Sequence, residues 1–210
     1  VAPQRVRDLL AAAGLESTLD RTRGIDHGTW VPLREMYPGA DVPVAQLALQ
    51  TQLGPAHHYR LGRALAALRH EGVLIVGSGS LTHNLRDMIF GVTEGSPRVP
   101  AYVPAFQAWI HDQVLARDVD ALVDYRRRAP GAVRAHPGEE HLLPLHVVLG
   151  ANEAGKSTLV AAMWAALTLR HRVGGNDRRT LARVPRGGGV PEVTRARDLA
   201  VLACLRELAR

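Results

Sequence analysis

Hydrophobic and polar positions along the first 150 residues follow helical and strand-like periods in turn. Apolar residues recur every three to four positions in 4–15 and 55–72, which is the spacing of one face of a helix. A glycine closes each segment, Gly14 in the first and Gly72 in the second, and glycine commonly ends helices. The pattern therefore predicts a helix in both segments.

Two further segments have the character of strands. Residues 41–49 are rich in apolar and β-branched positions, and 73–85 begin with the apolar run VLIV before a loop of glycine and serine. A third helical segment, 105–127, has one or two breaks. Helices and strands in this order predict an α/β fold with an open, mainly parallel sheet flanked by helices.

Composition changes near residue 150. Residues 1–150 hold 15 arginines and 15 acidic residues, whereas 151–210 hold 10 arginines, one lysine and 5 acidic residues. We therefore expect an α/β domain in 1–150 and a basic, helical tail in 151–210, with a loose stretch at 173–193 and a closing helix at 196–210. Such a tail could attract DNA, which makes a non-catalytic DNA-associated module one alternative. Because no interleaved aromatic residues or RNA-binding motif accompany the arginines, nucleic acid is not an expected partner.

The single cysteine, Cys204, excludes an intramolecular disulfide and favours a reducing, cytoplasmic location. No apolar run approaches the roughly 20 residues that a membrane helix needs, so we expect no membrane partner.

Histidines gather in loops at the ends of the predicted strands and helices. His27 lies in GIDHGTW, His83 follows the most apolar strand in GSGSLTHN, and His136 and His141 flank two glutamates in HPGEEHLLPL. Ligands of open α/β sheets collect at the carboxyl ends of the strands. Because histidine is a common metal ligand and transfers protons near neutral pH, these loops are candidates for a catalytic metal site.

Three ordered blocks of the sequence resemble the class III extradiol ring-cleavage dioxygenases, and within them the branch of 4,5-DOPA extradiol dioxygenases. They are GIDHGTWVPLREMYPGADVPVAQLAL, HYRLGRALAALRHEGVLIVGSGSLTHNLR and HPGEEHLLPLHVVLGA. The resemblance covers roughly residues 1–151 and corresponds to the C-terminal part of the family domain, because histidine motifs like GHGSP and SAHW do not occur here. We therefore expect a fold that is incomplete at its N-terminus, with an exposed sheet edge that favours self-association.

The resemblance implies a non-haem Fe(II) or Zn(II) ion that holds a catechol, such as DOPA, beside O₂. By motif, His83 falls on a metal-ligand or acid–base position, His141 on a metal-ligand position and His27 on a substrate-side position. His83 and His27 are thus the implied catalytic residues, and His83 and His141 the implied ligands. Proton transfer is needed because the catechol must lose protons and a later intermediate must gain one.

A second motif, GANEAGKS at 150–157, matches the phosphate-loop pattern and contains the only lysine of the chain, Lys156. Residues 145–190 resemble the corresponding region of a DNA-repair-type ATPase. The alternative function is therefore the binding of Mg-ATP. The residues that would form the loop and contact phosphate and Mg²⁺ are Gly150, Gly155, Lys156, Ser157 and Thr158.

A phosphate loop must follow a strand, and an NTPase needs a second apolar strand that ends in an acidic residue. No such acidic strand end occurs after Ser157. The stretch LPLHVVLG before the loop fits a strand or a helix, and we favour the helix. In that case the loop is absorbed into the helix and loses its phosphate-binding shape.

Overall fold

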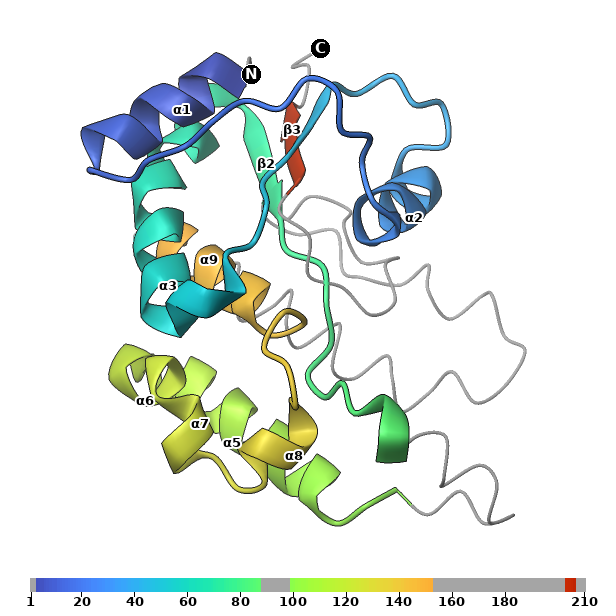
Figure 1. Cartoon of the computed structure of the whole chain (residues 1–210), viewed down its shortest axis with the longest axis vertical. Helices are drawn as coiled ribbons and strands as arrows, with labels where there is room; N and C mark the ends of the chain where they lie inside the picture. Colours follow the sequence, from blue (N-terminus) through green and yellow to red (C-terminus); the bar gives the residue numbers. More distant parts are fainter. Residues whose placement is uncertain (1–2, 88–98, 153–202, 207–210) are drawn as a thin grey trace, which may run out of the picture.

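The structure is a computed structural model, and it describes residues 3–87, 99–152 and 203–206 (Figure 1). No helix in these ranges combines the length and apolar character needed to cross a bilayer. In chain order the elements are α1 (Pro3–Ala12), α2 (His27–Met36), β1 (Val44–Gln46), the 3₁₀ helix η1 (Thr51–Leu53), α3 (Gly54–Leu65), the 3₁₀ helix η2 (Ala66–Glu71), β2 (Val73–Val76), α5 (Tyr102–Ala116), α6 (Val119–Val123), α7 (Tyr125–Arg128), α8 (Ala132–Ala135), α9 (Leu143–Ala151) and β3 (Ala203–Arg206).

The helices predicted in the first part of the chain are confirmed. Helix α1 ends before Gly14, and α3 continues into η2, which ends at Gly72. Both glycines have a positive φ, +69° and +68°, a left-handed conformation that other residues adopt only with strain. The apolar faces of α1 and α3 meet in a core that includes Leu10, Leu61 and Leu65.

The strands predicted near 41–49 and 73–85 are present as β1 and β2, but their sheet differs from the prediction. β3 lies between them, and both pairings are antiparallel, with Cys204 opposite Ala45 on one side and Ile75 on the other. The α/β class is compatible with these elements, whereas the mainly parallel sheet is not confirmed.

The helix predicted for 196–210 is wrong at Ala203–Arg206, which form β3. The apolar run there suits a helix or a strand when it is considered alone. In the structure its backbone pairs with two strands that are distant in sequence, and periodicity within one segment does not report such pairing. The expectations for residues 153–202, including the loose stretch, lie outside the described residues.

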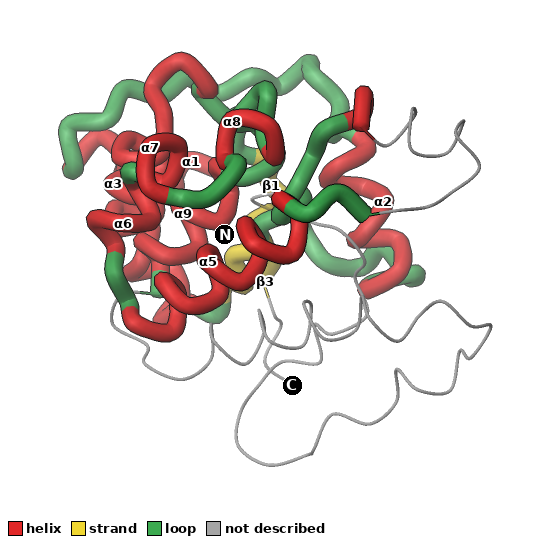
Figure 2. Tube along the Cα trace, turned by 90° about the horizontal axis from the view of Figure 1, so that it is seen from below, coloured by secondary structure: helices red, strands yellow, loops and turns green. Residues whose placement is uncertain are grey.

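The predicted helix at 105–127 is present with two breaks, as α5, α6 and α7. Arg117 adopts a left-handed conformation after α5, and the Asp118 carboxylate then accepts a hydrogen bond from the Ala121 amide at 2.8 Å and caps α6. In Figure 1 these helices gather with α8 at the end of the molecule opposite α1, and Figure 2 shows the molecule from the side of these helices. Their shared core contains Phe106, Ile110 and Tyr125.

Helix α9 confirms the helical interpretation of LPLHVVLG. It packs so closely on its neighbours that glycine is needed at the contacts. A β-carbon on Gly62 of α3 would collide with the Val147 carbonyl, and one on Gly150 would collide with the Tyr59 carbonyl. Gly150 is therefore a helix-packing residue in this structure, and the strand that a phosphate loop requires is not formed here.

Buried histidines link the helices to one another. His146 of α9 is 1% exposed, and its Nε2–H donates to the Leu122 carbonyl of α6 at 3.0 Å. His58 of α3 is fully buried; its Nδ1–H donates to the Gly54 carbonyl and its Nε2 accepts from the Gln50 amide. Burial lowers the pKa of His146 to about 4, so it is neutral at pH 7.

We expect the free energy of unfolding of His146→Gln to fall less than that of the parent when the pH is lowered from 6.5 to 4. Between pH 6.5 and 4 the unfolded chain binds a proton at residue 146 that the folded chain does not, so stability is full above this window and falls as the pH drops through it. The contribution of this residue is about 3 kcal/mol at most. Urea unfolding of both proteins at pH 7, 6, 5 and 4 measures it, and equal losses in the two proteins would contradict the prediction.

We expect Gly150→Ala to lower the free energy of unfolding by about 1–3 kcal/mol, because the added methyl group meets the backbone of α3. Gly24→Ala is the control, since no atom lies within 4 Å of its added β-carbon. Urea unfolding with and without Mg-ATP compares the two variants. A Gly150→Ala protein that is as stable as the parent but has lost binding of Mg-ATP would restore the phosphate-loop interpretation.

Candidate metal centre

His83 and His141 lie against each other although 58 positions separate them in the sequence. Their imidazole rings stack with centroids 3.5 Å apart and an angle of 25° between the planes. Glu140 completes a group in which one potential ligand atom of each residue lies within 4.8 Å of the others. Both histidines are half-buried and Glu140 is exposed, so the group is held by the protein on one side and reachable from solvent on the other.

Backbone hydrogen bonds bring the two histidines together. The loop after β2 runs beside the segment between α8 and α9 (Figure 1). The Ser80 amide donates to the His141 carbonyl at 3.0 Å, and the His83 amide donates to the Ala135 carbonyl at 2.8 Å. These bonds join the loop of one histidine to the segment of the other, so the pair forms through tertiary contacts rather than through sequence proximity.

Side chains add two bonds to the same junction. Asn84 Nδ2 donates to the Arg134 carbonyl at 2.7 Å, and His136 Nε2–H donates to the Leu81 carbonyl at 2.8 Å. A carbonyl oxygen only accepts, which assigns the proton of neutral His136 to Nε2. His136, which the sequence grouped with His141, is thus turned into the protein and is not a member of the ligand group in the described residues.

The turn that carries Glu140 is supported from α7. The Tyr125 hydroxyl donates to Glu139 Oε1 at 2.9 Å, and the Arg126 guanidinium lies 4.0 Å from the same oxygen. Burial is the main cause that raises the pKa of Tyr125, so its hydroxyl remains a donor at neutral pH. Glu139 therefore contacts Tyr125 and Arg126, whereas its neighbour Glu140 belongs to the group of potential metal ligands.

His27 reaches the same region from α2, where it is the first residue. Asp26 caps the helix by accepting from the Thr29 amide at 3.1 Å, and Gln46 of β1 donates to the other carboxylate oxygen at 2.8 Å. Ser78, in the loop after β2, donates to the Gly28 carbonyl at 2.8 Å and ties this helix start to the loop that carries His83. His27 is exposed and lies outside the group of three potential ligands.

The burial of His141 favours its neutral form. Burial is the main cause that lowers the pKa of His141, and His83 and His27 act in the same direction. His141 is therefore neutral at pH 7, and a neutral imidazole is the form that binds a metal.

The donor set fits a divalent transition-metal ion. Two imidazoles and one carboxylate are the ligands of non-haem sites that leave coordination positions open for substrates. Sequence reasoning identified His83 and His141 but missed Glu140. The available signal in the sequence was the position of Glu140 next to His141. This signal is weak, because adjacent glutamates on a protein surface are usually exposed to solvent without binding a metal.

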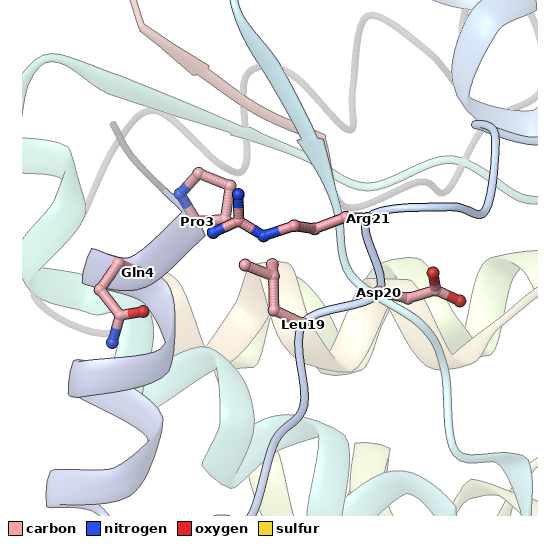
Figure 3. Close-up of a pocket in the computed structure, with 5 residues that line it drawn as sticks. All are labelled: Pro3, Gln4, Leu19, Asp20 and Arg21. Carbon is pink, nitrogen blue, oxygen red and sulfur yellow. The ribbon is translucent and has the colours of Figure 1, made fainter.

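The structure groups no potential metal ligands at the other candidate sites within the described residues. Of the phosphate-loop residues, Gly150 lies in α9, whereas Gly155, Lys156, Ser157 and Thr158 lie outside the described residues. A separate hollow of about 390 Å³ lies beside α1, far along the chain from His83 and His141, and is lined by Pro3, Gln4, Leu19, Asp20 and Arg21 (Figure 3). In Figure 3 the Asp20 carboxylate points away from the α1 side, and it accepts hydrogen bonds from Thr22.

A sequence profile described as the catalytic LigB subunit of aromatic ring-opening dioxygenase matches residues 4–170. The chain belongs to this family of class III extradiol dioxygenases. It is 44% identical to the 4,5-DOPA dioxygenase extradiol of Beta vulgaris over 76% of this chain and 59% of the relative. For the proteins of the same name from Portulaca grandiflora and Escherichia coli (strain K12), the identities are 42% and 37%, over 79% and 70% of this chain and 61% and 54% of the relatives.

The family membership confirms the resemblance found in the three sequence blocks. The chain spans little more than half of the length of these curated relatives. No comparison supports the phosphate-loop or DNA-associated alternatives.

We expect Asp26→Ala to lower the free energy of unfolding by about 1 kcal/mol, because it removes the cap of α2. Asp26→Asn is the matched variant, since it keeps a capping oxygen and loses only the bond that Gln46 donates, so its loss should be smaller than that of Asp26→Ala. Urea denaturation of the three proteins measures the difference. If alanine and asparagine behave alike, the cap does not hold the helix start that presents His27.

Proposed function

We propose that this chain forms part of a metal-dependent extradiol ring-opening dioxygenase that acts on a small catechol-type substrate with O₂. The observation that carries the proposal is the meeting of His83, Glu140 and His141 in a chain of the LigB family. Each residue comes from a region that the family resemblance singled out, and together they offer a donor set of the required kind.

Fe(II) is the proposed catalytic ion and Zn(II) a substitute that binds the same donors. When bound, the ion supplies open coordination positions for the two catechol oxygens and for O₂. Glu140 and His141 hold it from one segment, and His83 approaches from the other. A second role is proposed for the imidazole of His83, which is half-buried beside His141: it receives a proton from the catechol.

His27 is proposed to contact the substrate. It is exposed at the start of α2, and the Ser78–Gly28 hydrogen bond holds that start next to the loop of His83. An imidazole there can hydrogen-bond a substrate group without competing for the metal.

DOPA is the proposed catechol because relatives with 37–44% identity carry the name 4,5-DOPA dioxygenase extradiol. A cytoplasmic location and self-association through a sheet edge stay predictions from the sequence. So does a boundary near residue 150 between an α/β domain and a basic tail.

The first test is metal binding by the purified chain. We expect Zn(II) and Fe(II) to bind, and His83→Ala, His141→Ala and Glu140→Gln each to weaken binding by about tenfold or more, because each removes a donor. His70→Ala is the control, since His70 is exposed and lies in η2 outside the group. Titration calorimetry measures the affinities, and binding that is equal in all variants would place the ion elsewhere.

The second measurement is oxygen uptake by the Fe(II)-loaded chain with DOPA. We expect uptake by the parent and by His70→Ala, and its loss in His141→Ala. His83→Ala separates the two roles of this residue: weakened metal binding identifies a ligand, whereas normal metal binding without oxygen uptake identifies a proton-transfer group. Metal binding by the parent without uptake of oxygen would contradict activity of this chain.

A further inference from the structure

Two histidines of this protein are equally buried and make the same kind of hydrogen bond, but they connect different segments. His136 and His146 are 0% and 1% exposed, and each donates from Nε2 to a backbone carbonyl. His146 joins α9 to α6 within the helical core. His136 instead joins the segment of His141 to the loop of His83, through Leu81.

We propose that His136 is a positioning residue of the metal centre, which holds the His83 loop in the place where His83 and His141 can bind one ion. This inference rests on the proposed metal-dependent function. His136 does not contact the ion in this proposal, and it acts through the carbonyl of Leu81, two residues before His83.

The imidazole of His136 is held firmly enough to act in this way. The ring lies between aromatic neighbours, with its centroid 5.7 Å from that of Phe106 and 6.4 Å from that of Tyr125. The backbone of the residue is fixed as well, because its amide donates to Ala132 and its carbonyl accepts from Arg126, both at 2.9 Å. The donor therefore has one available direction, toward Leu81.

Two of the bonds at this junction depend on a side chain: the one that His136 donates to Leu81 and the one that Asn84 donates to Arg134. The bonds from Ser80 to His141 and from His83 to Ala135 are formed by backbone atoms and survive most substitutions. Leu81 is half-buried, and its side chain packs against the core of α5 to α8. Without the imidazole donor this carbonyl would be left unsatisfied, and the loop would have to move to reach solvent.

A small movement of the loop that carries His83 is enough to weaken metal binding. Metal–ligand distances tolerate deviations of only about 0.2 Å, so a shift of the His83 backbone weakens binding even when every ligand is retained. Groups that orient metal ligands typically affect metal affinity by about 10–100-fold when they are removed. An effect on affinity without loss of a ligand is the signature of a positioning residue.

The experiment compares His136 with His146 in the full chain. Leucine at either position removes the donor and keeps an apolar side chain of similar volume. Glutamine carries an amide nitrogen at about the reach of Nε2, whereas asparagine carries the same group one bond short. The six variants are His136→Leu, His136→Gln, His136→Asn, His146→Leu, His146→Gln and His146→Asn.

Zn(II) affinity and metal-free stability are measured for each variant by titration calorimetry and urea unfolding. We expect the leucine variants to lose similar stability, while only His136→Leu binds Zn(II) about tenfold more weakly than the parent. His136→Gln should restore the affinity and His136→Asn should not. If His136→Leu does not fold, the glutamine–asparagine pair decides the question by itself. Equal affinities across the His136 series, or equal losses at both positions, would overturn the proposal.

A metal-free readout separates this inference from the proposed function. Imidazole NMR signals of His83 and His141 are assigned by their absence in the two alanine variants. We expect His136→Asn to shift both signals and His146→Asn to leave them in place. If the parent binds no Zn(II), the proposed function fails at this site, and the NMR comparison still supports or overturns the positioning role of His136.

Discussion

The close approach of α9 to its neighbours is the constraint on which the rest of this structure depends. Glycine stands at each tight contact: Gly62 of α3 faces the Val147 carbonyl, Gly150 faces the Tyr59 carbonyl, and Gly77 after β2 faces Val148 and the Pro144 carbonyl. At Gly62 and Gly150 backbone lies against backbone, which leaves little room for sliding because no flexible side chain stands between the helices. The helix and the end of β2 are thereby fixed relative to each other.

The geometry of the candidate metal centre depends on this packing. His141 lies just before the first turn of α9, and the loop that begins at Gly77 leads to His83. Because both segments start from the same tight contact, a short set of hydrogen bonds suffices to align them over the following residues. The site is therefore built on the edge of a rigid core, which suits a centre whose ligands must keep fixed distances.

Histidine has two separate uses in this protein. His58, His136 and His146 are buried and bonded to the backbone, where a neutral imidazole provides a polar link inside an apolar core. His83 and His141 face the candidate centre and keep nitrogen atoms for a ligand. Burial separates the two groups, because a fully desolvated imidazole is confined to its internal partner whereas a half-buried one can also meet an ion from solvent.

The sequence by itself determined most of the local structure and the family. Helical spacing with a closing glycine located α1 and α3, and the motifs around His83 and His141 identified both the family and two of the three potential ligands. These features are local, since a period, a cap or a motif is complete within a few residues.

The tertiary structure decided which distant segments meet. It paired β3 antiparallel with β1 and β2, added Glu140 to the ligand group and turned His136 away from it into the core. It also assigned Gly150 to helix packing instead of phosphate binding. The physical reason is the same in each case: contacts between segments far apart in the sequence decide the outcome, and a pattern within one segment does not report them.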